Sequence, residues 1–275
     1  MEDILRAIAL GVIQGLTEFL PISSSGHLIV TRELFGWEFA DDLTFDVALH
    51  LGTTVAVIAY FWGEWVSMLR SGLRRLFRRD KSPGAQEAYD SRLLVLLAIG
   101  SVPAGLTGVI FDAFLEDEVR SPIVVGVMLI VFGVVLYLAE RFSRGRRDVA
   151  STDVADAVWV GAAQAISLIP GVSRSGITIS AAMARGFSRQ EAARLSFLLA
   201  TPAILGAGLL KSGEAVVEGI PSEDVDAIVA GAIVSGVVGW LSIRYLLRLL
   251  QSGTFAQFVV YRLIAGAFIV VYFSV

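Results

Sequence analysis

The 275-residue chain contains no cysteine, which excludes disulfides, catalysis by a thiolate and cysteine-ligated metal or iron–sulfur sites. Lysine occurs only at positions 81 and 211, and 22 basic residues face 26 acidic ones, for a formal net charge of -4. This balance provides no excess of basic residues that could bind nucleic acid, so we exclude nucleic acid as a partner. Charged residues make up only 17% of the chain, against about 25% in average globular proteins, so an ordinary soluble domain is excluded as well.

Hydrophobic residues make up 55% of the chain, and the mean hydropathy of the chain is +0.72. A helix needs about 20 apolar residues to cross the hydrocarbon core of a membrane. Six stretches reach or nearly reach that length and predict an all-α, polytopic membrane protein with one integral domain over residues 1–275. These spans are residues 45–62, 93–111, 122–139, 194–213, 227–243 and 258–275.

Two further apolar segments, residues 4–37 and 155–186, are each interrupted by a polar run that contains a proline. Backbone of this kind survives at membrane depth only where protein or water shields it. We therefore interpret both segments as re-entrant helical hairpins with polar tips inside the membrane.

The short connections alternate in charge. Residues 63–91 and 140–155 are rich in arginine and are expected on the cytoplasmic side, whereas the other connections are acidic and are expected outside. The first hairpin then enters from outside, together with the amino terminus, and the second from the cytoplasm. The first residues lack the basic region and the cleavage site of a signal peptide.

Sliding the chain by 150 residues reveals an internal repeat. Repeat one covers about 1–141 and repeat two about 155–275, and each holds one hairpin followed by three spans. An odd number of spans inverts the second copy, which predicts an inverted-topology repeat with the two broken segments meeting near the midplane. The superposed pairs are Gly11 and Gly161, Gln14 and Gln164, Ser23 and Ser173, Ser25 and Ser175, and Gly26 and Gly176.

The two polar tips carry the candidate site residues. In the first, Gln14 and Glu18 share one face of a helix that Pro21 ends, and hydroxyls and His27 follow. In the second, Arg174 is flanked by small and hydroxyl residues, and a helix N-terminus with free backbone N–H groups follows. Ionisable residues at membrane depth are costly and mark function by default. Together the tips predict a cradle for a phosphate ester, and a purely structural Glu18–Arg174 ion pair is the alternative.

Asp46 and His50 lie in a third polar stretch. His50 is either a structural polar contact or a group that supports the site from behind, with Asp46 beside it.

Both motifs resemble those of the undecaprenyl-diphosphate phosphatase family, which is linked to bacitracin resistance. The first motif is the Gln14-xxx-Glu18 pair running into residues 21–27, Pro-Ile-Ser-Ser-Ser-Gly-His, and the second is residues 170–178, Pro-Gly-Val-Ser-Arg-Ser-Gly-Ile-Thr. The stretch from Thr44 to Gly52 and the order of the spans are similar too, so the resemblance covers nearly the whole chain.

The resemblance implies a multi-pass enzyme of the plasma membrane that converts undecaprenyl diphosphate to the monophosphate carrier lipid, with a divalent cation, Mg²⁺ or Ca²⁺, and a site open to the extracytoplasmic side. It makes Ser24 the favoured nucleophile, His27 the acid or base and Arg174 the diphosphate clamp. Glu18 and Gln14 would hold the cation, although Gln14 stands where the family can have a glutamate and supplies no charge. The remaining diphosphate-binding candidates are Ser23, Ser25, Ser173, Ser175, Gly176 and Thr178.

Other interpretations stay open at this point. Attack by His27 or by water is an alternative to attack by Ser24. A phosphatidic-acid-type phosphatase is disfavoured because the position six residues after Arg174 is Ser180 rather than histidine. The non-enzyme alternative is a polyprenyl-phosphate transporter or flippase, since inverted repeats with broken helices are transporter architecture. The expected partners are the lipid substrate and membrane lipids, and a homodimer is left open.

Overall fold

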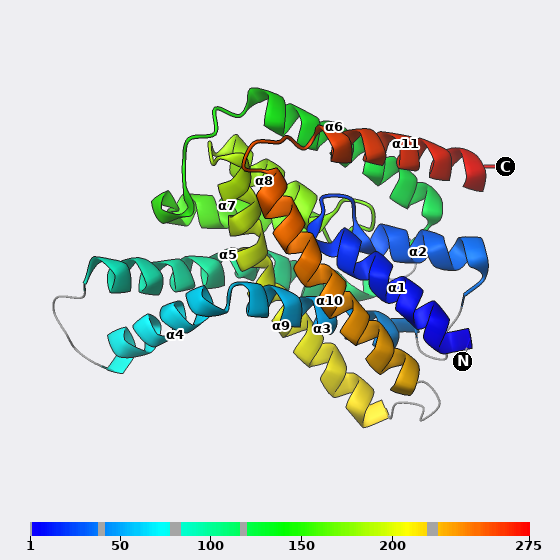
Figure 1. The fold of residues 1–275 in the computed structure, drawn as a ribbon, viewed down its shortest axis with the longest axis horizontal. Coiled ribbons are helices and arrows are strands. Elements are labelled where there is room, and N and C mark those ends of the chain that lie inside the picture. Colours follow the sequence, from blue (N-terminus) through cyan, green and yellow to red (C-terminus); the bar gives the residue numbers. More distant parts are fainter. Residues whose placement is uncertain (1, 38–41, 78–83, 116–119, 219–224) are drawn as a thin grey trace.

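The computed structural model describes residues 2–37, 42–77, 84–115, 120–218 and 225–275. Within these ranges the regular structure is helical and contains no β-strand, only an isolated bridge between Arg147 and Phe187 (Figure 1). The all-α prediction is therefore confirmed. The helices are α1 (Glu2–Phe19), α2 (Ser24–Phe35), α3 (Asp42–Tyr60), α4 (Trp62–Phe77), α5 (Ala85–Leu115), α6 (Pro122–Phe142), the 3₁₀ turn η1 (Val149–Ser151), α7 (Val154–Ile166), α8 (Arg174–Ala184), α9 (Arg189–Glu218), α10 (Val225–Leu249) and α11 (Ala256–Phe273).

Five helices of the described chain, in α5, α6, α9, α10 and α11, are long and apolar enough to cross a membrane. A sixth span arises if α3 and α4, which meet at a bend of 78°, are counted together. The chain is thus a multi-pass membrane protein, with apolar helices at each of the six stretches that hydropathy indicates. Their side chains facing outward are largely apolar, as lipid requires.

The segment 63–91 is not simply the connection that its charge suggests. It forms α4 and the first turns of α5, which pack against each other and project together from one end of the molecule (Figure 1). Helix α4 is amphipathic: Trp65 and Met68 are buried, while Arg70 and Arg74 are exposed. A charged connection therefore folds as a helix because only one of its faces is polar. Parts of the basic and acidic connections, at 78–83, 116–119 and 219–224, lie outside the described residues.

The two interrupted segments are each a pair of short helices separated by a loop. In the first, residues 20–23 separate α1 from α2, and in the second, residues 167–173 separate α7 from α8. Both second helices begin after a serine with a positive φ, 77° at Ser23 and 72° at Ser173. Each of these serines accepts a hydrogen bond from the backbone N–H three residues later. A positive φ is energetically costly for a residue with a side chain. The two segments nevertheless share the same strained serine cap.

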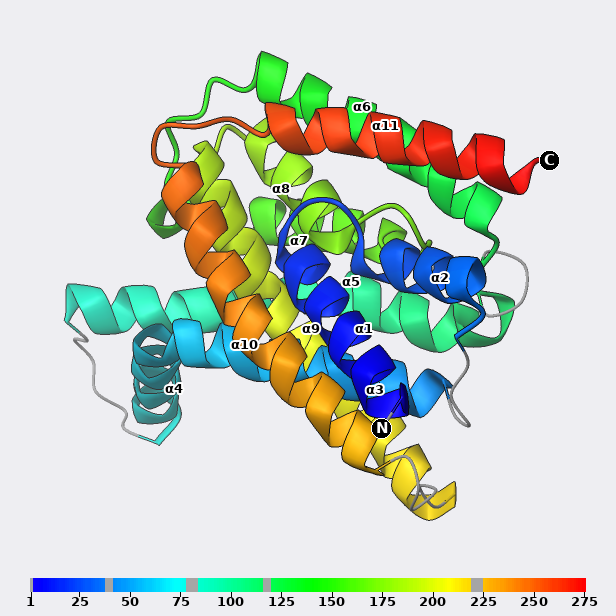
Figure 2. The same cartoon turned by 45° about the vertical axis from the view of Figure 1, so that its right-hand side comes forward.

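Small residues set how closely these helices pack. Helix α1 lies against α10, and a Cβ on Gly11 would come within 2.6 Å of the Gly231 carbonyl oxygen. Helix α7 lies against α5 in the same manner, with only 2.1 Å between a Cβ on Gly161 and the Gly100 carbonyl oxygen. Helices α6 and α11 run side by side along one edge of the molecule (Figure 2). Close glycine contacts of this kind hold helices together where lipid offers no hydrophobic driving force.

Asp156, in the first turn of α7, anchors the second interrupted segment to the segment before it. Its side chain accepts hydrogen bonds from Arg147 and Arg185, and Arg147 also lies over the ring of Phe187. Burial by itself would raise the pKa of the Asp156 carboxyl, but the bonds from the two arginines outweigh burial and hold the pKa at about 2, against an ordinary 3.8. The carboxylate is therefore charged whenever the protein is folded near neutral pH.

Replacing Asp156 by asparagine is expected to lower the free energy of unfolding by about 2 to 4 kcal/mol at pH 7, because two arginines lose their anion. Since the pKa is lowered in the folded state, this stabilisation is present above pH 4 and lost as the pH falls toward 2. Thermal unfolding in detergent of wild type and Asp156→Asn should therefore differ at pH 7 and converge near pH 2. Asp3→Asn, at an exposed carboxylate, is the control that should change little; a difference that stays constant from pH 7 to 2 would contradict the assignment.

Candidate active site

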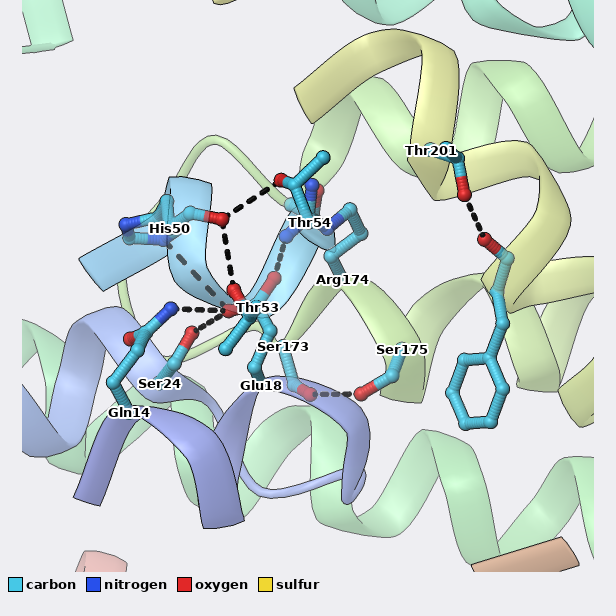
Figure 3. Close-up of polar contacts among 12 residues, drawn as sticks. Gln14, Glu18, Ser24, His50, Thr53, Thr54, Ser173, Arg174, Ser175 and Thr201 are labelled. Carbon is cyan, nitrogen blue, oxygen red and sulfur yellow. Dashed lines mark hydrogen bonds and ion pairs between the residues drawn. The ribbon is translucent and has the colours of Figure 1, made fainter. Parts of the chain in front are cut away.

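The core of the site is the Glu18 carboxylate at the end of α1 (Figure 3). One of its oxygens, Oε2, accepts hydrogen bonds from Gln14 Nε2 at 3.0 Å and from Ser24 Oγ at 2.5 Å. Gln14 reaches it because residues four apart share a helix face, and Ser24 because the loop at Pro21 turns the chain back. The Glu18 side chain is only 2% exposed, so its charge must be satisfied inside the protein.

Arg174 satisfies that charge from the other interrupted segment. Its Nη2 forms an ion pair with Glu18 Oε1, the oxygen that Gln14 and Ser24 leave free. Ser24 is the first residue of α2 and Arg174 the first residue of α8, so the two groups occupy equivalent places after the two strained serine caps. The structure thus brings a hydroxyl, a carboxylate and a guanidinium from both halves of the chain to one point.

Of the third polar stretch, only His50 lies at this point. Its Nε2 is 3.7 Å from Glu18 Oε2, while its Nδ1 bonds to the Asp46 backbone oxygen at 2.8 Å (Figure 3). The Asp46 carboxylate instead forms a two-bonded ion pair with Arg32, at 2.8 and 3.0 Å. Asp46 therefore supports α2, which carries Arg32, and reaches His50 only through its backbone.

His27 points away from Ser24. One ring nitrogen lies 2.6 Å from the Ser23 carbonyl oxygen and the other 2.6 Å from the hydroxyl of Tyr261 on α11. The group positioned to accept the Ser24 proton in this structure is Glu18 rather than His27. The role of His27 as acid or base stays a prediction, and it would require the ring to turn.

The remaining hydroxyls join the two loops to each other. Ser23 Oγ accepts a bond from the Gly171 N–H at 3.1 Å, and Ser175 Oγ donates to the Leu20 carbonyl at 3.1 Å. Thr178 Oγ1 bonds to the Arg174 carbonyl at 2.7 Å and lies 2.6 Å from Ser196 Oγ. These side chains are buried, Gly176 donates to the Ser173 cap, and Ser25 is half-buried in the first turn of α2. These side chains hold the two loops together, and their contact with a diphosphate stays a prediction.

Arg262 on α11 is the residue that our sequence analysis missed. It is fully buried, and its hydrogen bonds to the described residues all go to backbone carbonyl oxygens, which include Pro21 in the first loop at 3.0 Å and Gly171 and Val172 in the second at 3.0 Å. Further bonds reach Leu129 and Met128 on α6. An arginine inside an apolar span is a signal that the sequence does contain, since ionisable groups at that depth mark function.

A cation would find oxygen ligands here, but few of them. No group of three or more His, Asp or Glu side chains that could hold a metal occurs among the residues that the structure describes. Gln14 Oε1, however, is buried without a hydrogen-bond partner, beside the Glu18 carboxylate to which Gln14 Nε2 is bonded. A carboxylate and an unsatisfied amide oxygen suit a hard divalent cation whose other ligands come from a bound phosphate or from water.

The chain is similar to known proteins of one family over nearly its whole length. The family model described as bacitracin resistance protein BacA matches residues 7–268. A relative from Pelotomaculum thermopropionicum, named undecaprenyl-diphosphatase, is 43% identical over 268 residues, which cover 98% of this chain and 96% of the relative. Relatives of the same name from Moorella thermoacetica and Pelobacter propionicus are 43% and 45% identical, over 98% of this chain and 98% and 96% of their own lengths.

Proposed function

The chain belongs to the BacA family, and from this we propose that it is an undecaprenyl diphosphatase, which hydrolyses undecaprenyl diphosphate to undecaprenyl monophosphate and inorganic phosphate. Hydrolysis recycles the carrier lipid for cell-wall or glycan synthesis. The observation that carries the proposal is the Ser24–Glu18–Arg174 arrangement, in which a hydroxyl, a proton acceptor and a guanidinium from two separate segments converge. A nucleophile beside a base is the signature of covalent catalysis.

Ser24 Oγ attacks the terminal phosphorus, and Glu18 accepts the hydroxyl proton across the 2.5 Å hydrogen bond. The bond between that phosphorus and the bridging oxygen breaks, and undecaprenyl monophosphate leaves. Water then cleaves the phosphoserine and releases inorganic phosphate. Arg174 turns from Glu18 to the phosphate oxygens and neutralises the charge that they carry in the transition state.

Glu18 and Gln14 Oε1 would hold a divalent cation, Mg²⁺ or Ca²⁺, together with oxygens of the diphosphate. Such an ion supplies further neutralisation of phosphate charge when it is bound. His50 Nε2 lies 3.7 Å from Glu18 Oε2 and stays beside the carboxylate when Arg174 leaves it.

The architecture proposed with this function is an inverted-topology repeat over about 1–141 and 155–275, with residues 4–37 and 155–186 as re-entrant hairpins. Two features support it: the twin serine caps at positive φ, and the matched packing of α1 on α10 and of α7 on α5. We place the protein in the plasma membrane with the site open to the extracytoplasmic side, where the acidic connections lie. The oligomeric state, with a homodimer as one candidate, is left to measurement.

The test is release of inorganic phosphate from undecaprenyl diphosphate by the purified protein in detergent, where no membrane barrier exists. Wild type is expected to release phosphate, and a chelator should reduce the rate by about 100-fold or more, with recovery on adding back Mg²⁺ or Ca²⁺. Activity that is indifferent to the chelator would remove the cation from the proposal. Lipid binding without phosphate release would instead favour a polyprenyl-phosphate transporter or flippase built on the same repeat.

A further inference from the structure

A cavity of about 400 Å³ lies apart from the Ser24–Glu18–Arg174 site and shares no residue with it. Its walls come from the ends of three helices: Tyr60 is the last residue of α3, Gln190 lies in the first turn of α9, and the last turns of α10 supply most of the rest. The volume falls within the range of about 300 to 1,000 Å³ that is usual for ligand sites. The lining residues are Tyr60, Gln190, Trp240, Arg244, Leu247, Arg248 and Gln251.

The cavity is cationic and holds no balancing carboxylate. Arg244 and Arg248 are both exposed, and neither forms an ion pair within the part of the chain that the structure describes. The Arg244 guanidinium lies over the Trp240 ring, 5.5 Å from its centroid, which holds it in place without neutralising it. Arg147, Arg185 and Arg194, by contrast, each have a carboxylate partner. Two unpaired guanidinium groups with amide neighbours suit a phosphate group.

An apolar track leads to this pair of arginines. Helix α10 exposes a hydrophobic side chain at every fourth position, each 50–62% exposed, and the row runs to Tyr245, which directly follows Arg244 in the sequence. Residues four apart lie on one face of a helix, so the row is continuous along its surface. Its members are Val229, Ile233, Val237, Leu241 and Tyr245.

We propose that this cavity binds the phosphate headgroup of an anionic phospholipid, with an acyl chain of that lipid along the α10 row. The headgroup phosphate accepts hydrogen bonds from Arg244 and Arg248, and the amides of Gln190 and Gln251 face the remaining polar atoms. Trp240 and Tyr60 supply the amphipathic rings that are typical of the membrane–water boundary. Basic pockets between spanning helices are a known form of lipid site. The ligand is distinguished from a soluble phosphate by the apolar track.

The test is native mass spectrometry of the full-length, delipidated protein in detergent, titrated with dioleoyl phosphatidylglycerol. Wild type is expected to bind one lipid more tightly than any further lipid. Arg244→Gln with Arg248→Gln should weaken that first binding by about tenfold or more, since each basic residue near an anionic lipid contributes about fivefold. The matched control is Arg141→Gln with Arg144→Gln, which removes two exposed arginines outside the cavity and should change the affinity by less than about twofold.

Several results would overturn the proposal. Equal weakening by both double substitutions would show an effect of total charge and no site. Equal affinity for phosphatidylcholine would remove the preference for an anionic headgroup, and displacement of the lipid by an equal concentration of inorganic phosphate would identify a soluble anion as the ligand. Circular dichroism and phosphate release should be unchanged in Arg244→Gln with Arg248→Gln, and they check that the variant is folded.

Discussion

Replacing Arg174 by alanine is expected to lower kcat/KM for phosphate release by about a thousandfold or more. Arg174 is the cation at the site that can turn to a phosphate, because Arg262 is engaged by backbone carbonyls. Arginines that stabilise a transferring phosphoryl group typically contribute about 10³ to 10⁵ in rate. Arg174→Lys keeps the charge but loses the forked geometry, so an intermediate rate is expected. The measurement is steady-state phosphate release with undecaprenyl diphosphate in detergent, and Arg70→Ala, at an exposed arginine on α4, is the control.

Variants of Arg174 and Glu18 distinguish a catalytic role of Arg174 from a purely structural ion pair. Arg174→Ala leaves the Glu18 carboxylate buried without its cation, which costs stability. Adding Glu18→Gln removes that charge, so the double variant should regain thermal stability while phosphate release stays as low as in the single variant. If the double variant regained activity along with stability, the ion pair would be structural and the clamp would have to be sought elsewhere.

Replacing Arg262 by methionine is expected to abolish phosphate release to below about 1% and to lower stability at the same time. The substitution leaves the carbonyls of Pro21, Gly171 and Val172 buried without their donor. Each buried acceptor left unsatisfied costs about 1 to 3 kcal/mol. The loops that these carbonyls belong to lead directly into Ser24 and Arg174, so a small shift of either loop separates the nucleophile from the clamp. Lysine at 262 reaches fewer of the carbonyls, and partial activity is expected.

A merely structural role for Arg262 makes a different prediction, and Asp156→Asn provides the comparison. That variant is destabilised at a place remote from the two loops. Assayed well below both melting temperatures, Asp156→Asn should keep kcat near wild type, whereas Arg262→Met should lose kcat with a smaller change in KM. Equal activity of the two variants at matched stability would reduce Arg262 to a packing residue.

Composition and apolar length predicted the spanning helices because lipid imposes one rule on every spanning residue, namely that backbone groups bond within the segment. Hydropathy therefore located α5, α6, α9, α10 and α11, although α5 and α9 begin earlier than their apolar cores. The arginine-rich composition of segment 63–91 indicates a connection, whereas the amphipathic periodicity within it favours a helix. The structure forms α4 there, with Met68 buried on one face.

The sequence by itself determined that the chain is a multi-pass helical membrane protein with two polar breaks, and it predicted that Gln14, Glu18, Ser24 and Arg174 lie together, as they do. It could do so because unpaired charges and helix breaks are costly in lipid and occur mainly at functional sites. Only the tertiary structure decided which polar group meets which. It turned His27 to Tyr261, paired Asp46 with Arg32, and gave the Ser24 proton an acceptor in Glu18. It also showed Arg262 tying both loops. Spacing along the chain fixes only neighbours within one helix, whereas these bonds depend on side-chain directions set by packing between helices far apart in sequence.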